Sequence, residues 1–178
     1  MSMRYLTQGE KENSRRLYEC CFPEDSQKFV DYYYQEKCRE NEIAVIEENG
    51  KIISMVHANP FTVSCCGTQA EVHYIVAVAT DPEYRRRGYM RQLMQQVLRD
   101  CRNRGEVFSF LMPADPAYYE PLGYRYWNNQ YVWEIPKEQE LLLKGFCQNP
   151  EYQSDADPKA LAQMADRILA DQFDLYIL

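Results

Sequence analysis

Three consecutive arginines stand directly before a glycine in residues 81–90, DPEYRRRGYM. Arg85, Arg86 and Arg87 precede Gly88, and Arg91 follows, in a chain whose formal net charge is −7. Guanidinium groups form charge-assisted hydrogen bonds with phosphate oxygens. Glycine has no Cβ and lets a phosphate approach the backbone closely. The stretch therefore predicts a phosphate-binding loop, although a basic loop that only meets solvent fits so short a motif about equally well.

A predicted strand precedes this loop and a predicted helix follows it. The strand is indicated by apolar residues at alternate positions, Val72, Tyr74, Val76 and Val78. The helix is indicated by an apolar stripe of helical period, Met90, Leu93, Met94, Val97, Leu98 and Cys101. The strand should end at Thr80 and the helix at Gly105. At such a junction the free N–H groups and the helix dipole, equivalent to about half a positive charge, favour an anion.

The elements upstream predict an antiparallel meander preceded by two helices. A strand at residues 3–6 comes first, then a helix over residues 10–22 and a second helix with Ser26 as its N-cap. Tyrosines 32–34 in the second helix fit either core packing or the lining of a substrate pocket. Asn49-Gly50 and then Gly67-Thr68 predict hairpin turns between strands rich in β-branched residues.

The elements downstream complete a mixed fold. Residues 106–112 predict a strand, residues 115–123 a short helix capped by Asp115, and residues 124–135 closing strands. After a polar linker, residues 161–169 predict a helix, and DLYIL at the end a strand without an evident partner. We therefore expect an α/β (α+β) fold whose central sheet is mostly antiparallel, contains one parallel strand pair and is flanked by helices.

Composition excludes several classes of function. A net charge of −7 and a pI near 5.0 argue against bulk binding of nucleic acid. No segment has the pattern of a signal peptide or the length of a membrane span. The seven cysteines are odd in number and include no C-x-x-C pair, so their spacing predicts neither a disulfide framework nor a metal site. We expect a soluble, cytoplasmic protein with reduced thiols.

The arginine loop resembles the pyrophosphate loop of the GNAT superfamily of N-acetyltransferases, Q/R-x-x-G-x-G/A. Arg85 and Gly88 match that motif, whereas Met90 replaces its second small residue. RRRGYMR at residues 85–91 is similar to the R-R-R-G-x-x-R of the enhanced-intracellular-survival (Eis-like) type, in which a bulky residue is usual at this position. YYEPLGY at residues 118–124 resembles the later Y-x-x-x-G-[FY] segment of the same superfamily. The resemblance covers about residues 3–135.

The resemblance implies the GNAT fold, acetyl-CoA as cofactor and transfer of its acetyl group to an amine. It implies that the cofactor is bound by Val78, Ala79, Thr80, Arg85, Arg86, Arg87, Gly88, Tyr89, Met90, Arg91, Ala114 and Asp115. Tyr119 matches the tyrosine that serves as general acid in the family. The acceptor would be a small molecule, a polyamine or aminoglycoside-like compound, or a protein. A homo-oligomer is also expected from the family.

Residues 1–136 are predicted to form the acetyltransferase domain. Residues 137–178 would be a linker, a helix and a strand that could open a further domain of a longer chain. In the Eis-like type, the carboxylate of the far carboxy terminus acts as general base, and Leu178 does not match that position.

Alternatives remain for the general base and for the class of function. The base could be His73, Glu71 or water, with less claim for His57. The chain could also be a non-catalytic acyl-CoA-binding module, or a protein that binds nucleotides or phosphopeptides through the same arginines.

Overall fold

A mixed sheet organises the fold in the computed structural model, which describes residues 2–65, 67–127, 157–170, 173 and 175–177. The strand order is β1-β2-β3-β4-β5, and β6 pairs with β3 outside this path. The strands are β1 (Ser2–Tyr5), β2 (Glu42–Glu48), β3 (Lys51–Cys65), β4 (Thr68–Thr80), β5 (Ser109–Phe110) and β6 (Leu175–Ile177). All pairings are antiparallel except that of β4 with β5. The predicted fold class is confirmed.

The chain forms two compact units. Residues Met1–Tyr124 with Phe173–Leu178 make the first, and Arg125–Gln172 make the second. The second unit contains α5 (Pro158–Ala170), which confirms the helix predicted over residues 161–169. The predicted domain limits at residues 136 and 137 lie outside the described residues and stay a prediction. Within the described part of the chain, no helix is both long enough and apolar enough to cross a membrane.

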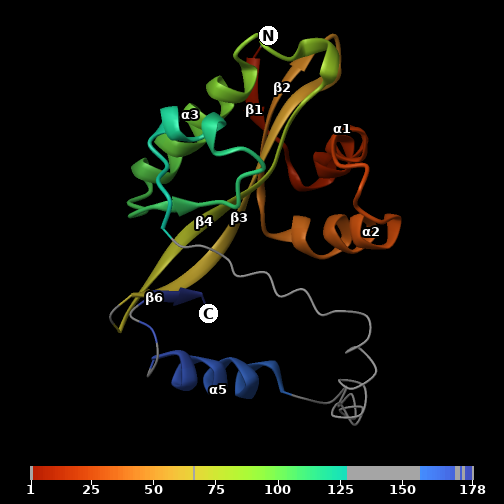
Figure 1. The fold of residues 1–178 in the computed structure, drawn as a ribbon. Helices are drawn as coiled ribbons and strands as arrows, with labels where there is room; N and C mark the ends of the chain where they lie inside the picture. The colour runs from red at the N-terminus through yellow and green to blue at the C-terminus, as the bar shows by residue number, and fades with distance from the viewer. Residues whose placement is uncertain (1, 66, 128–156, 171–172, 174, 178) are drawn as a thin grey trace, which may run out of the picture. The chain divides into compact units, whose positions relative to one another are not determined.

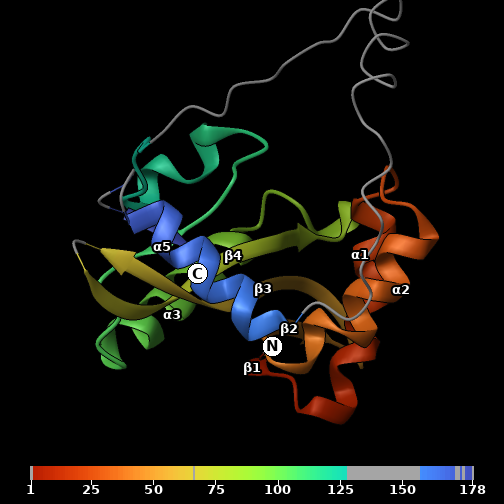
Figure 2. The same cartoon turned by 90° about the horizontal axis from the view of Figure 1, so that it is seen from below.

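Helices cover both faces of the sheet in the first unit, as Figure 1 and Figure 2 show. The helices α1 (Arg15–Cys21) and α2 (Gln27–Gln35) pack on one face, and α3 (Tyr89–Asn103) packs on the other. The first core joins α1 and α2 to the sheet through Leu17, Tyr18, Val30, Tyr33, Tyr34, Ile43, Val45 and Met55. The second joins α3 to it through Leu93, Met94, Val97, Cys101, Ile46, Ile53, Val56 and Ile75.

The local signals for these helices are largely confirmed. The Ser26 hydroxyl accepts a hydrogen bond from the Phe29 amide at 3.2 Å, as expected of an N-cap. Tyr33 and Tyr34 are buried, whereas Tyr32 is 49% exposed, so the tyrosine triplet contributes mainly to the core. The region predicted as one helix over residues 10–22 is instead a 3₁₀ helix, Gln8–Ser14, that leads into α1.

A β-bulge in β4 overturns the predicted alternation. Met55 of β3 lies opposite Ala79 and His57 opposite Val76, so two residues of β4 face one residue of β3. Ala77 has a φ of 49° at this point. Val76 consequently packs against the first core and Val78 against the second. The prediction that Val76 and Val78 share a face was wrong, because the extra residue at the bulge reverses the side-chain alternation.

The segments after α3 also differ from expectation. The strand predicted over residues 106–112 is only two residues long, and the predicted short helix is two 3₁₀ turns, Pro116–Tyr118 and Glu120–Leu122. Residues 124–127 form no strand, and the rest of the predicted closing strands, 128–135, lies outside the described residues, as does the predicted linker. The terminal strand has a partner after all, because β6 pairs with residues Val63–Cys65 of β3.

Candidate active site

The carboxyl end of β4 extends beyond its parallel neighbour. The last pair of β4 with β5 joins Tyr74 to Phe110, whereas β4 continues through the bulge to Thr80. In the described part of the chain, no strand pairs with this edge of β4 after Tyr74. Backbone groups on an unpaired edge can bind an extended ligand as an added strand would. The bulge and the early end of β5 therefore leave this edge of β4 unpaired at Val78, Ala79 and Thr80, three residues for which the family resemblance implies contact with the cofactor.

Val78, Ala79 and Thr80, the residues predicted to bind the cofactor at this edge, differ in the contacts of their carbonyl groups. The Ala79 carbonyl accepts a hydrogen bond from the Ser54 hydroxyl at 3.0 Å. The Thr80 carbonyl accepts from Arg85 Nε at 3.2 Å and lies 3.7 Å from Cys21 Sγ. Val78 has no side-chain donor on its carbonyl among the described residues.

A buried carboxylate fixes the start of the arginine loop. Asp81 Oδ2 lies 2.6 Å from Lys51 Nζ, and Asp81 Oδ1 accepts a hydrogen bond from the Glu83 amide at 3.1 Å. The hydrogen bond with the Lys51 ammonium lowers the pKa of Asp81 below its usual value. The contact joins β3 to the loop that leaves β4. This ion pair was not predicted from the sequence, although an Asp-Pro directly after a strand is a typical N-cap signal.

The four arginines of the loop divide into two kinds. Arg85 binds the Thr80 carbonyl, and Arg87 donates to the Glu83 carbonyl at 3.1 Å while its guanidinium lies 5.0 Å from the centre of the Tyr84 ring. Arg86 and Arg91 are exposed and have no hydrogen-bond or ion-pair partner among residues that the structure describes. We infer that Arg85 and Arg87 shape the loop, and that Arg86 and Arg91 are free to bind an anion.

The first turn of α3 supplies unpaired backbone donors. Gly88 is the N-cap of α3 and has a φ of 82°. In the described structure, no acceptor contacts the amide groups of Gly88, Met90 or Arg91. A Cβ at Gly88 would meet nothing within 4 Å, so the glycine is required by its backbone conformation and leaves open space beside these donors. Unpaired amides, a helix N-terminus and two free guanidinium groups suit the pyrophosphate of acetyl-CoA.

Tyr119 borders the same core as the start of α3. Tyr119, Val78, Tyr89 and Met90 all pack against the second core. The Tyr119 ring meets Tyr124 edge to face, with 6.0 Å between centroids, and burial raises the pKa of Tyr119. Among the described residues the Tyr119 hydroxyl has no hydrogen-bond partner. A protonated hydroxyl without a partner is able to donate a proton to a ligand.

The two other predicted cofactor residues follow β5. Ala114 and Asp115 are exposed, and the Asp115 carboxylate accepts a hydrogen bond from the Ala117 amide at 2.9 Å. Asp115 therefore caps the 3₁₀ turn Pro116–Tyr118, as its sequence position predicted.

The candidate bases lie in unfavourable places. His73 and Val78 are separated by five positions along β4, or roughly 16 Å at about 3.3 Å per residue, which exceeds the reach of direct proton transfer. Glu71 is further along and accepts a hydrogen bond from the Thr62 hydroxyl at 2.6 Å. His57 is fully buried against Tyr33, and burial lowers its pKa to about 3. None of the three side chains is well placed to act at Val78.

The comparisons with known proteins agree with this geometry. Residues 2–127 match the acetyltransferase (GNAT) domain family. No curated protein matches the chain at a significant level. A probable N-acyltransferase from Enterococcus faecalis V583 superposes with a TM-score of 0.63 at 22% identity, over 69% of this chain and 32% of that one. This chain therefore spans about a third of the length of the Enterococcus protein.

Two further solved structures match this chain over almost their whole length. The aminoglycoside N-acetyltransferase AAC(6')-Iy gives a TM-score of 0.61 at 16% identity over 76% of this chain and 97% of its own. Glucosamine-6-phosphate N-acetyltransferase from Arabidopsis thaliana gives 0.58 at 17% identity over 76% and 98%. At these identities the likeness shows the fold, and the family match covers more than half of the chain. The chain belongs to the GNAT family of acetyltransferases, which use acetyl-CoA.

Proposed function

We propose that this protein is an N-acetyltransferase that transfers the acetyl group of acetyl-CoA to an amine. The observation that carries the proposal is the Gly88 loop, at the junction of β4 and α3. It combines unpaired amides, open space at Gly88 and the exposed side chains of Arg86 and Arg91. Arg85, Arg87, Tyr89 and Met90 would complete the pyrophosphate site. Ala114 and Asp115 would form a lesser contact, since the Asp115 carboxylate already caps a turn.

The chain's own groups can meet the needs of the reaction. Bound acetyl-CoA supplies an activated thioester. A backbone N–H at Val78 or Ala79 would stabilise negative charge on the carbonyl oxygen, an effect worth up to about 4 kcal/mol per preorganised donor. Tyr119 would protonate the departing thiolate. Its hydroxyl carries the needed proton at neutral pH, because burial raises the pKa of Tyr119. None of His57, Glu71 and His73 is well placed to act as the base, so we propose that a water molecule accepts the proton of the amine.

The acceptor is proposed to be an amine of a small molecule, a polyamine or aminoglycoside-like compound, or a protein. The net charge of −7 favours the approach of cationic acceptors. Some structural neighbours act on aminoglycosides and on glucosamine 6-phosphate, both of which carry amines. These neighbours share the fold at low identity, so they support the amine class and leave the individual substrate open.

We further propose an Eis-like type, with residues 1–136 as the acetyltransferase domain and 137–178 as a separate segment. The support is the RRRGYMR motif at residues 85–91 together with the family match over residues 2–127. The described cysteines, Cys20, Cys21, Cys38, Cys65 and Cys101, are free thiols, which supports a reducing compartment such as the cytoplasm. A homo-oligomer also remains a prediction.

A thiol-release assay tests the proposed function. Acetyl-CoA is incubated with the protein and, in separate reactions, with spermidine, an aminoglycoside and a lysine peptide. We expect release of free coenzyme A that depends on both the protein and one class of amine. Saturable binding of acetyl-CoA without turnover for any amine would instead indicate an acyl-CoA-binding module. Equal competition by simple nucleotides would indicate a general nucleotide site.

A further inference from the structure

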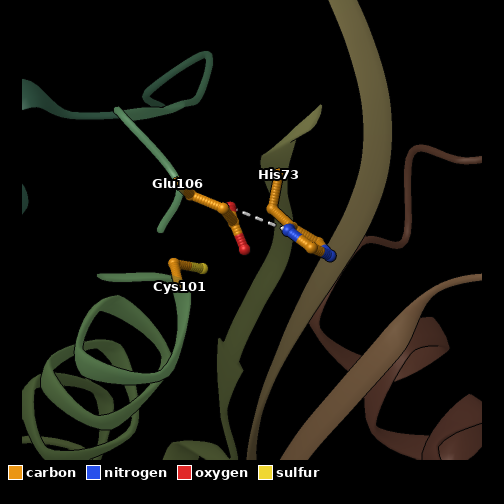
Figure 3. A group of neighbouring side chains, drawn as sticks. All are labelled: His73, Cys101 and Glu106. Atoms are coloured by element: carbon orange, nitrogen blue, oxygen red, sulfur yellow. Dashed lines mark hydrogen bonds and ion pairs between the residues drawn. The ribbon is translucent and has the colours of Figure 1, made fainter. Parts of the chain in front are cut away.

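A second group of reactive side chains lies at the other end of α3. His73 of β4, Cys101 of the last turns of α3 and Glu106 just beyond the helix place one ligand atom each within 4.8 Å of one another. His73 Nδ1 and Glu106 Oε2 are 2.9 Å apart. Figure 3 shows the Glu106 carboxylate directed toward both the His73 ring and the Cys101 sulfur. A strand, a helix and the segment after that helix thus contribute one donor atom each to one cluster.

We propose that His73, Cys101 and Glu106 bind one divalent transition-metal ion of the zinc class. Nitrogen, sulfur and carboxylate oxygen are the donors that zinc and cobalt prefer, whereas magnesium and calcium prefer oxygen alone. The ion would take the place of the hydrogen between His73 Nδ1 and Glu106 Oε2. That proton would move to Nε2, so that His73 binds the ion through Nδ1 as a neutral imidazole. Cys101 would bind as the thiolate and release its proton to solvent.

Arg104 has the contacts of an outer partner of such a site. Its Nε donates to Glu106 Oε1 at 2.9 Å, which leaves Oε2 for the ion. Its Nη2 lies 3.4 Å from Cys101 Sγ and would stabilise a thiolate. Outer hydrogen bonds of this kind orient metal ligands. Arg104 also pairs with Glu42 at 3.2 Å, so the charges of the ion, Arg104, the thiolate and the two carboxylates sum to zero.

The surroundings leave room for a fourth ligand. A pocket of about 380 Å³ is lined by His73, Arg104, Glu106 and Glu71, among others. A water molecule entering from this pocket would complete the four-coordinate geometry that zinc favours. The Cys101 side chain is buried beside it. The pocket therefore gives an ion access to His73 and Glu106, the two ligands that line it.

The proposed metal site is separate from the acetyltransferase site and does not depend on it. The 15 residues of α3 place Gly88 and Cys101 roughly 20 Å apart at about 1.5 Å per residue. An ion here would tie the end of α3 to β4 and so support the core that Tyr119 borders. Residues 73, 101 and 106 lie too far apart in the sequence to form a recognisable metal motif, which is why cysteine spacing predicted none.

Cobalt binding tests the proposal. We expect Co²⁺ titrated into the EDTA-treated, full-length protein to bind one ion per chain, with a thiolate-to-cobalt charge-transfer band and the visible bands of four-coordinate cobalt. Zn²⁺ should displace it and raise the unfolding temperature. Cys101→Ser should abolish the charge-transfer band, and His73→Gln should weaken metal binding at least tenfold. Cys38→Ser removes another buried thiol and should leave the band unchanged.

The outcomes separate a metal site from a plain ion pair. If the wild type shows no cobalt band and no zinc-dependent shift, His73, Glu106 and Arg104 form only an ion-pair network and the proposal is wrong. A band that survives Cys101→Ser would assign the metal to other thiols, such as exposed Cys20, and would equally overturn it. A serine at position 101 could impair folding. His73 lines the pocket, so His73→Gln provides a test that does not depend on the Cys101 variant.

Discussion

The Tyr119 hydroxyl is the side-chain group on which the proposed chemistry most depends. It is half-buried, has no partner among the described residues and stays protonated because burial raises its pKa. We expect Tyr119→Phe to lower kcat roughly a hundredfold, since general acid catalysis contributes about 10² to 10⁴, with acetyl-CoA affinity unchanged. Tyr118→Phe is the matched control, because Tyr118 is 64% exposed and should be silent. Unchanged turnover in Tyr119→Phe would remove this residue from the mechanism.

His57 predicts a pH dependence of stability rather than of catalysis. Its pKa is lowered from 6.5 to about 3 by burial, so in this range the unfolded chain binds a proton that the folded chain does not. The stability that depends on neutral His57 is therefore fully present above pH 6.5. Below that pH, the free energy of unfolding falls by about 1.4 kcal/mol per pH unit. His57→Phe keeps an aromatic ring beside Tyr33 and removes the titration. Denaturant unfolding between pH 6 and pH 4 should show this extra slope in the wild type only, and equal slopes would contradict the account.

At the scale of elements, the Lys51–Asp81 ion pair fixes the loop that leaves β4. We expect Asp81→Asn to lower the free energy of unfolding by about 1–2 kcal/mol at neutral pH, because it removes a charge-assisted hydrogen bond at a partly exposed lysine. Asp81 has a lowered pKa, so the stability that it provides is present above its usual value near 3.8 and is lost as pH falls below it.

Unfolding curves at two pH values measure this effect. The wild type and Asp81→Asn should differ at pH 7 and converge near pH 2. Acetyl-CoA binding should also weaken in Asp81→Asn, since Asp81 holds the segment that leads to Gly88. A difference in stability that persisted at pH 2 would show that the loss does not come from the carboxylate charge.

Local signals in the sequence were sufficient for most elements of the fold. The Asn49-Gly50 turn has the positive φ values, 51° and 75°, that this dipeptide allows, and the apolar stripe of α3 predicted its buried face. The bulge at Ala77 was not predictable, because it depends on how β4 pairs with β3 and not on the residues of β4 alone. The bulge changes the site most, since it turns Val78 toward the core that Tyr119 borders.

The different contacts of the four loop arginines likewise could not be predicted from the sequence. RRRG indicated an anion site, and the open space beside Gly88 agrees with it. Nothing in the sequence distinguished Arg85 and Arg87, which bind backbone carbonyls, from Arg86 and Arg91, which do not. Those contacts depend on the turn between β4 and α3. Tyr119 was identified through the family resemblance, because one tyrosine among 15, directly beside Tyr118, carries no signal of its own.

For the molecule as a whole, we expect the junction of β4 and α3 to bind acetyl-CoA. Isothermal titration calorimetry of acetyl-CoA into the wild type and two variants tests it most directly. Gly88→Asp would place a carboxylate beside the amides of α3. Gly67→Asp is the matched control, because Gly67 has a similar φ of 76°, equally open surroundings and a place in the hairpin turn between β3 and β4.

We expect acetyl-CoA to bind saturably to the wild type and to Gly67→Asp. It should not bind to Gly88→Asp, which circular dichroism should show to be folded. This result would establish that the arginines and the glycine of an acidic protein hold the phosphates of a cofactor. Absence of binding to folded wild type, or equal binding to all three proteins, would contradict the claim and leave the chain with the GNAT fold but without the proposed site.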